Sequence, residues 1–153
     1  MKEKERVVNA HTRLLVVDDM ATMRNLIRKM LRAIGYTTID EAEDGVSALE
    51  KLRTQQFDLV ITDWNMPNMD GLTLLQEIRK SDLAELPVLM VTAEKRRENV
   101  LAAINAGASG YIVKPFSEAA LADKLAQIAP PLASAAPTGK DTSGFGAIFE
   151  RTL

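Results

Sequence analysis

Five polar residues stand at the ends of short apolar runs, where burial makes an unpaired charge costly. Asp18 and Asp19 follow the run RLLVV, Asp63 follows LVIT, Thr92 ends VLMVT, and Lys114 follows GYIV. Carboxylates that gather in one place repel one another and raise one another's pKa. A divalent cation removes that penalty, and oxygen ligands without histidine or cysteine favour a hard ion such as Mg²⁺.

Such a magnesium site suits phosphoryl chemistry, because Mg²⁺ keeps several waters and binds phosphate oxygens. One carboxylate can then act as the nucleophile and form an aspartyl phosphate. Lys114 and Thr92 would contact the remaining phosphoryl oxygens. Taken singly, each residue also has a plainer interpretation. Asp18 and Asp19 could cap the first helix, Asp63 a strand end and Thr92 the fourth helix, and Lys114 could simply be solvated.

The apolar runs alternate with helical patterns, which predicts the elements that position these residues. Strands are expected at 13–17, 37–42, 57–62, 87–92 and 109–113. Helices are expected from the stripe at 23–34, after Asp44, after Asp70, at 96–106, and from Ser117 to Ile128. Gly35 stands where a C-cap glycine belongs. Five strands alternating with five helices predict an α/β fold, a parallel sheet with helices on both faces.

In such a sheet, ligands lie beyond the carboxyl ends of the strands. The five polar residues are therefore expected together at one edge. The chain has 153 residues, a net charge of −2 and no cysteine, which argues against nucleic-acid binding, disulfides and thiolate metal sites. No apolar run reaches the ~18 residues of a membrane span, and no signal peptide is evident. A membrane partner is not expected, and the predicted location is cytoplasmic.

Four further segments, together with the acidic pair and the Lys-Pro pair, carry a family resemblance. They are ATMRNLIRKML, DWNMPNMDG, PVLMVTAE and RENVLAAINAGASGYIVKPF. The sequence resembles the receiver domain of two-component response regulators over roughly 13–128, and within that family the chemotaxis response regulators. The resemblance implies a flavodoxin-like (βα)5 fold, with five parallel strands and five helices. It divides the chain into an N-terminal extension (1–12), a receiver domain (13–129), and a linker with a short C-terminal segment (130–153).

The resemblance also implies a role for each residue at the sheet edge. Asp63 would accept a phosphoryl group from the phosphohistidine of a histidine kinase. Asp19, Asp63 and the backbone carbonyl of Asn65 would bind Mg²⁺ directly, and Asp18 mainly through water. Lys114 would offset the phosphoryl charge. Thr92 would hydrogen-bond a phosphoryl oxygen and move toward it.

Four positions near the edge carry expected roles in switching, partner contact and dephosphorylation. Tyr111 matches the aromatic switch position of the family and would turn inward as Thr92 moves; the plainer interpretation is a half-exposed strand aromatic. Lys95 would contact the partner, or else is ordinary surface charge. Asn65 and Glu94 resemble the pair that tunes attack by water during dephosphorylation.

The expected function is that of a stand-alone signalling protein that catalyses only its own phosphorylation and dephosphorylation. No output domain is expected after the last helix, so the output is expected to be a protein contact through the face formed by the helix at 96–106, the strand at 109–113 and the helix from Ser117 to Ile128. The resemblance implies a histidine kinase of the chemotaxis type, the flagellar motor switch protein or another target, and a possible phosphatase as partners.

Three alternatives stay open. A phosphate sink or relay would use the same chemistry with another protein partner. An aspartate-nucleophile phosphatase usually has a second acid two residues after the nucleophile, and here that residue is Asn65. A flavin-binding domain of similar topology would meet repulsion between the acidic edge and the flavin phosphate.

The tail departs from the family pattern. PPLASAAPTGKDTSG has the composition of a linker, and FGAIFERTL follows it. Phe145, Ile148, Phe149 and Leu153 fall on one helical stripe. An isolated helix of this length is marginal, so the segment is either disordered or docked near the end of the last helix.

Overall fold

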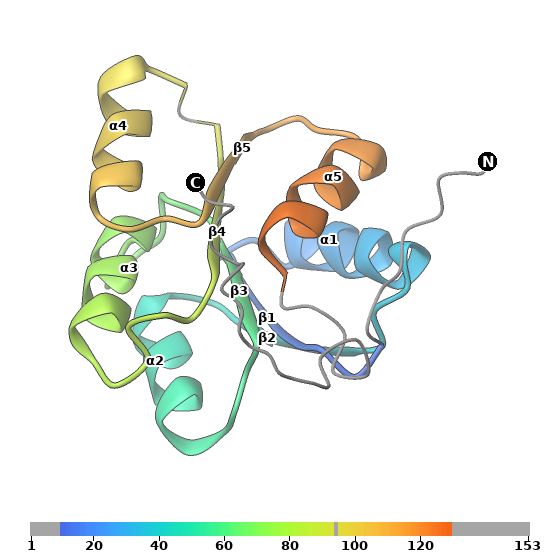
Figure 1. Cartoon of the computed structure of the whole chain (residues 1–153), viewed down its shortest axis with the longest axis horizontal. Helices are drawn as coiled ribbons and strands as arrows, with labels where there is room; N and C mark the ends of the chain where they lie inside the picture. Colours follow the sequence, from blue (N-terminus) through green and yellow to red (C-terminus); the bar gives the residue numbers. More distant parts are fainter. Residues whose placement is uncertain (1–9, 94, 130–153) are drawn as a thin grey trace, which may run out of the picture.

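The computed structural model describes residues 10–93 and 95–129, which form a five-stranded parallel sheet covered by helices on both faces. The strand order is β2-β1-β3-β4-β5. Helices α1 and α5 lie on one face, and α2, α3 and α4 lie on the other (Figure 1). The elements are β1 (Arg13–Val17), α1 (Ala21–Ile34), β2 (Thr38–Ala42), α2 (Gly45–Thr54), β3 (Leu59–Thr62), α3 (Gly71–Lys80), β4 (Val88–Thr92), α4 (Arg97–Asn105), β5 (Gly110–Val113) and α5 (Glu118–Ile128). The predicted fold class is confirmed.

Two apolar cores sandwich the sheet, because successive side chains of a strand point to opposite faces. In β1, Leu14 and Val16 enter the core under α1 and α5. Leu15 and Val17 enter the core under α2 and α3. All four are buried. Strands buried on both faces read as continuous apolar runs rather than alternating patterns, as RLLVV and LVIT do.

The expected helix ends are confirmed at four positions. Gly35 follows α1 with a φ of 132° and donates its backbone N–H to the Leu31 carbonyl. The side chains of Asp44, Asp70 and Ser117 accept backbone hydrogen bonds at the starts of α2, α3 and α5. These caps satisfy backbone donors that a helix start leaves without an internal partner.

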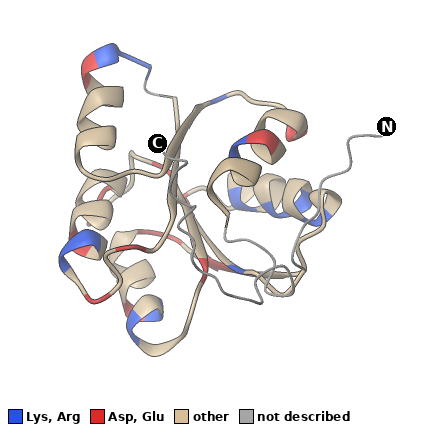
Figure 2. Cartoon of the chain, viewed as in Figure 1, with Lys and Arg blue, Asp and Glu red and all other residues tan. Residues whose placement is uncertain are grey.

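Charged residues of both signs occur on both sides of the sheet (Figure 2). Within residues 10–93 and 95–129, no helix is long and apolar enough to cross a membrane. The predicted N-terminal extension, apart from its last three residues, lies outside the described ranges. So do Glu94, the linker and the stripe from Phe145 to Leu153.

Candidate functional site

Asp18 and Asp63 leave neighbouring strands at the same level of the sheet. Val17 at the end of β1 pairs with Thr62 at the end of β3. The Asp63 backbone N–H donates to the Val17 carbonyl at 2.9 Å, so the pairing continues one step beyond the strands. The parallel register therefore delivers both carboxylates to one edge, as the sequence predicted.

Asp19 completes a cluster of three carboxylates. One oxygen from each of Asp18, Asp19 and Asp63 lies within 4.8 Å of the others. Asp18 and Asp63 are 1% and 8% exposed, whereas Asp19 is exposed. Burial raises the pKa of Asp63; the Lys114 ammonium lowers it, and the Asp18 charge raises it further. Ionised Asp63 is thus held in an unfavourable setting that a cation would relieve.

Lys114 supplies one cation to this cluster. Its ammonium lies 3.3 Å from Asp18 Oδ2 and 3.4 Å from Asp63 Oδ2, and its side chain is 17% exposed. Its backbone N–H donates to the Thr92 carbonyl at 2.9 Å, which ties the ends of β4 and β5 together. The interpretation of Lys114 as a solvated surface lysine is wrong.

The helix-cap interpretations are wrong as well. The N-cap of α1 is Met20, and its side chain makes no cap hydrogen bond. The N-cap of α4 is Arg96, four residues beyond Thr92. Thr92 is fully buried as the last residue of β4.

Gly71 and Asn68 shape the loop after Asp63, although neither was predicted to take part in the site. A Cβ on Gly71 would lie 2.0 Å from the Asp63 carbonyl oxygen, so only glycine allows α3 to approach the nucleophile strand this closely. Asn68 has a φ of 69° and donates from Nδ2 to Asp44 Oδ2 at 2.7 Å. Asn commonly occupies this left-handed region. The asparagine at position 68 was therefore the sequence signal that could have indicated this turn.

The other residues predicted near the site differ in their burial and contacts. Asn65 is exposed in the loop after Trp64. Trp64 is half-buried and donates its backbone N–H to Asp63 Oδ1 at 2.7 Å. Tyr111 on β5 packs partly buried against the core under α2 and α3, and Lys95 is exposed. Glu94 lies outside the described residues.

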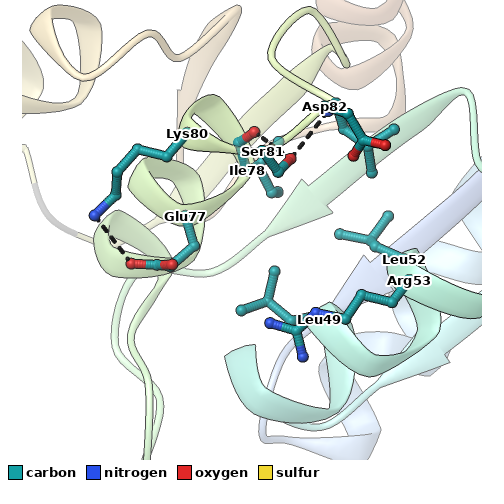
Figure 3. A pocket seen from close by; sticks show the side chains of 9 residues that line it. Leu49, Leu52, Arg53, Glu77, Ile78, Lys80, Ser81 and Asp82 are labelled. Carbon is teal, nitrogen blue, oxygen red and sulfur yellow. Dashed lines mark hydrogen bonds and ion pairs between the residues drawn. The ribbon is translucent and has the colours of Figure 1, made fainter.

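A separate groove of about 360 Å³ lies between α2 and α3 (Figure 3). Leu49, Leu52 and Arg53 of α2 face Glu77 and Ile78 of α3 across it. None of the cluster residues lines it. The groove involves the carboxyl-terminal ends of these helices, whereas the cluster lies at the carboxyl ends of the strands. The groove therefore lies toward the amino ends of the strands, away from the cluster.

Comparison with known proteins decides the family. The sequence profile described as "Response regulator receiver domain" matches residues 14–126. The chain belongs to the response regulator receiver domain family. The receiver fold and the similarity to chemotaxis response regulators, both expected from the sequence, are confirmed.

Relatives and solved structures agree with this assignment. The chain is 48% identical over 125 residues to chemotaxis protein CheY-3 of Vibrio cholerae, covering 81% of this chain and 96% of that protein. It is 47% identical over 117 residues to chemotaxis protein CheY of Pseudomonas aeruginosa, covering 76% and 94%. The structure of Vibrio cholerae CheY4 superposes with a TM-score of 0.71 at 34% identity, covering 76% of this chain and 98% of that chain.

Receiver domains bind Mg²⁺ at an acidic pocket, and the cluster of Asp18, Asp19 and Asp63 fits that ion. The donors are all carboxylate oxygens, which suit a hard cation. The buried pair carries charge that Lys114 only partly offsets. Proteins of this family are signalling proteins rather than classical enzymes.

Proposed function

We propose that this receiver domain is a phosphoryl-accepting response regulator in which Asp63 receives the phosphoryl group of a histidine kinase. The observation that carries the proposal is the placement of Lys114 between Asp18 and Asp63 beside the exposed Asp19. This arrangement combines a buried carboxylate nucleophile, further carboxylates for a cation, and one ammonium.

The transfer forms one bond and breaks one. A carboxylate oxygen of Asp63 attacks the phosphorus of phosphohistidine, and the phosphorus–nitrogen bond breaks with its electron pair going to the imidazole. The Lys114 ammonium, which contacts the Asp18 and Asp63 carboxylates before the transfer, would then contact the phosphoryl oxygens. Asp18, Asp19, Asp63 and the Asn65 carbonyl would hold Mg²⁺, which when bound offsets the charge of the phosphoryl oxygens.

Switching is proposed to run from Thr92 to the face formed by α4, β5 and α5. The Thr92 hydroxyl would bond a phosphoryl oxygen and move toward it. Tyr111 lies on the adjacent strand, paired with Met90 two residues before Thr92. It would turn inward into the space so formed, and Lys95 would lie beside the partner. Asn65 and Glu94 would tune the later attack of water on the acyl phosphate.

The first experiment tests phosphorylation. The full chain is incubated with acetyl phosphate and Mg²⁺, and intact mass is measured for the wild type and for Asp63→Asn. One added phosphoryl group on the wild type and none on the variant is expected. Full labelling of the variant would show that Asp63 is not the acceptor. Trp64 is the only tryptophan and its backbone contacts Asp63, so Mg²⁺ should also change its fluorescence.

A response regulator of this kind works with a histidine kinase and a downstream target. We propose the flagellar motor switch protein as the target, because the relatives are chemotaxis proteins. A pull-down with and without beryllium fluoride, an acyl-phosphate mimic, tests this choice. Capture of the motor switch protein only with the mimic is expected. Phosphorylation without such capture would favour the sink or relay.

A further inference from the structure

Arg24 connects three elements beside the acidic cluster. It lies in the first turn of α1, and its Nη1 donates to the backbone carbonyl oxygen of Asp18 at 2.6 Å. Its Nε donates to Glu41 Oε1 on β2 at 2.8 Å. The Arg24 and Glu41 side chains are only 17% and 26% exposed. One guanidinium therefore ties the end of β1 to α1 and to the edge strand.

Arg28 offers a matched comparison one turn further along α1. Its Nε donates to Glu41 Oε2 at 2.9 Å, and its Nη2 also bonds that oxygen. Within the described parts of the chain, Arg28 bonds Glu41 alone and does not reach Asp18. The two arginines thus share the same helix and the same carboxylate, and they differ in the contact with Asp18.

Asp18 is held at four points, and each comes from a different residue. Its backbone N–H donates to the Ala42 carbonyl at 3.1 Å. Its carboxylate accepts from the Met20 backbone N–H at 2.9 Å and from the Lys114 ammonium at 3.3 Å. Arg24 holds the fourth point, the backbone carbonyl. Met20 makes no side-chain cap, so the guanidinium stabilises the turn into α1 from outside.

Glu41 holds the Arg24 guanidinium in its position. A guanidinium is always charged and binds carboxylates well. Asp19 is exposed, and its carboxylate has no hydrogen-bond or ion-pair partner among the described residues. Arg24 freed from Glu41 would be drawn to this carboxylate and would compete with a metal ion for it. Bound to Glu41, the guanidinium reaches the uncharged carbonyl of Asp18 instead.

We propose that Arg24 is a positioning residue for Asp18, and that Glu41 keeps the Arg24 cation on the Asp18 main chain and away from the metal-binding carboxylates. This inference rests on the proposed function, because it assigns a role to residues around the proposed Mg²⁺ site. Arg24 touches neither substrate nor reacting atom and acts only through Asp18. We therefore expect that removing the Arg24 cation and removing its Glu41 partner both weaken Mg²⁺ binding.

The first readout is the Mg²⁺ dissociation constant from Trp64 fluorescence. Arg24→Gln should raise this constant about fivefold, the effect expected for the net loss of one ordinary hydrogen bond, whereas Arg28→Gln should change it less than about twofold. Both variants lose a bond to Glu41, so general loosening of α1 would affect them equally. Arg24→Lys keeps the charge but not the planar fork, and should fall between Arg24→Gln and the wild type.

The second readout needs no metal. The Met20 amide donates to Asp18 Oδ1, so its hydrogen-exchange rate in EDTA reports the position of that carboxylate. Exchange should be faster in Arg24→Gln than in Arg28→Gln. If the wild type neither bound Mg²⁺ nor became phosphorylated, the proposed function would fail while this comparison would still decide the role of Arg24. Equal exchange and equal Mg²⁺ affinity in the two variants would overturn the role of Arg24.

A double variant tests the part played by Glu41. Glu41→Gln should weaken Mg²⁺ binding in the wild type, because it frees Arg24. In the Arg24→Gln background the same change should have no further effect, because no cation is left to compete. An undiminished effect of Glu41→Gln in that background would show that Glu41 does not act through Arg24.

Discussion

The Lys114 ammonium lies 3.4 Å from the carboxylate of Asp63, the proposed phosphoryl acceptor. The pair joins the end of β5 to the end of β3, and β4 lies between them in the sheet. The same ammonium also contacts Asp18, so it is shared between two carboxylates before any phosphoryl group arrives. A phosphoryl group on Asp63 would bring further oxygens toward a cation that is already in place.

Lys114→Arg tests whether the position of this cation matters beyond its charge. A guanidinium is larger and planar, so it keeps the charge but misplaces it. We expect phosphorylation of Asp63 to persist by intact mass, while the phosphate-dependent gain in partner affinity is lost. Lys80→Arg is the control, because Lys80 is exposed and, among the residues that the structure describes, forms an ion pair only with Glu77 on its own helix. Wild-type affinity gain in Lys114→Arg would refute the role of Lys114.

Asp63→Asn should stabilise the metal-free protein at neutral pH. Burial and the Asp18 charge raise the pKa of Asp63 and outweigh the attraction of Lys114. The folded state therefore binds more protons than the unfolded state, and the wild type loses stability as pH rises from 3.8 through the folded-state pKa. Asparagine carries no charge and avoids that loss.

Urea unfolding in EDTA across a pH series measures this difference. The advantage of Asp63→Asn should shrink as pH falls and disappear once Asp63 is protonated in both states. Millimolar Mg²⁺ should also reduce it, because the cation stabilises the ionised wild type. Asp82→Asn removes an exposed carboxylate and should show no comparable effect. A variant less stable than the wild type at neutral pH without metal would contradict the prediction.

Gly71→Ala should destabilise the fold by roughly 1–3 kcal/mol, the usual cost of overpacking. The added Cβ would lie 2.0 Å from the Asp63 carbonyl oxygen and 3.0 Å from Trp64 Cα, both backbone atoms that move only with the strand end. Phosphorylation by acetyl phosphate should slow as well, because Asp63 itself is displaced. Thermal unfolding and the labelling rate are the measurements.

Gly110→Ala is the control for Gly71→Ala. Its Cβ would come 3.1 Å from Leu89 Cδ1, the end of a flexible side chain, so the cost should be smaller. It should leave the labelling rate unchanged, since Gly110 begins β5 at the end away from Lys114. Equal losses in both glycine variants would show that the approach to Asp63 is not the cause.

Asn68→Ala should cost more stability than Asn68→Gly. Both variants lose the hydrogen bond to Asp44, but only alanine must also hold a φ of 69°, at a cost of roughly 1–2 kcal/mol. Backbone hydrogen bonding from Ser47 and the bond from Asn68 lower the pKa of Asp44. In both variants that pKa should therefore rise toward its ordinary value. Urea unfolding and NMR titration of Asp44 are the measurements, and equal stability of the two variants would exclude backbone strain at Asn68.

The sequence alone determined the elements of the fold and the edge that carries the chemistry. Continuous apolar runs, helical stripes and capping residues such as Asp44 and Ser117 are local signals, because each depends on neighbours in the chain. Parallel topology then places the residues that follow each strand at one edge. The convergence of Asp18, Asp63 and Lys114 could therefore be predicted without coordinates.

The tertiary structure decided what depends on residues far apart in the chain. Asp18 and Asp19 are adjacent in sequence, yet one is buried and the other exposed. The approach of Gly71 to Asp63 and the bond of Asn68 to Asp44 also required the packed loops. Arg24 looks like any basic residue of an amphipathic helix until β2 brings Glu41 beside it. No local pattern encodes such contacts, because their distances are set by the register of neighbouring strands and the packing of helices on them.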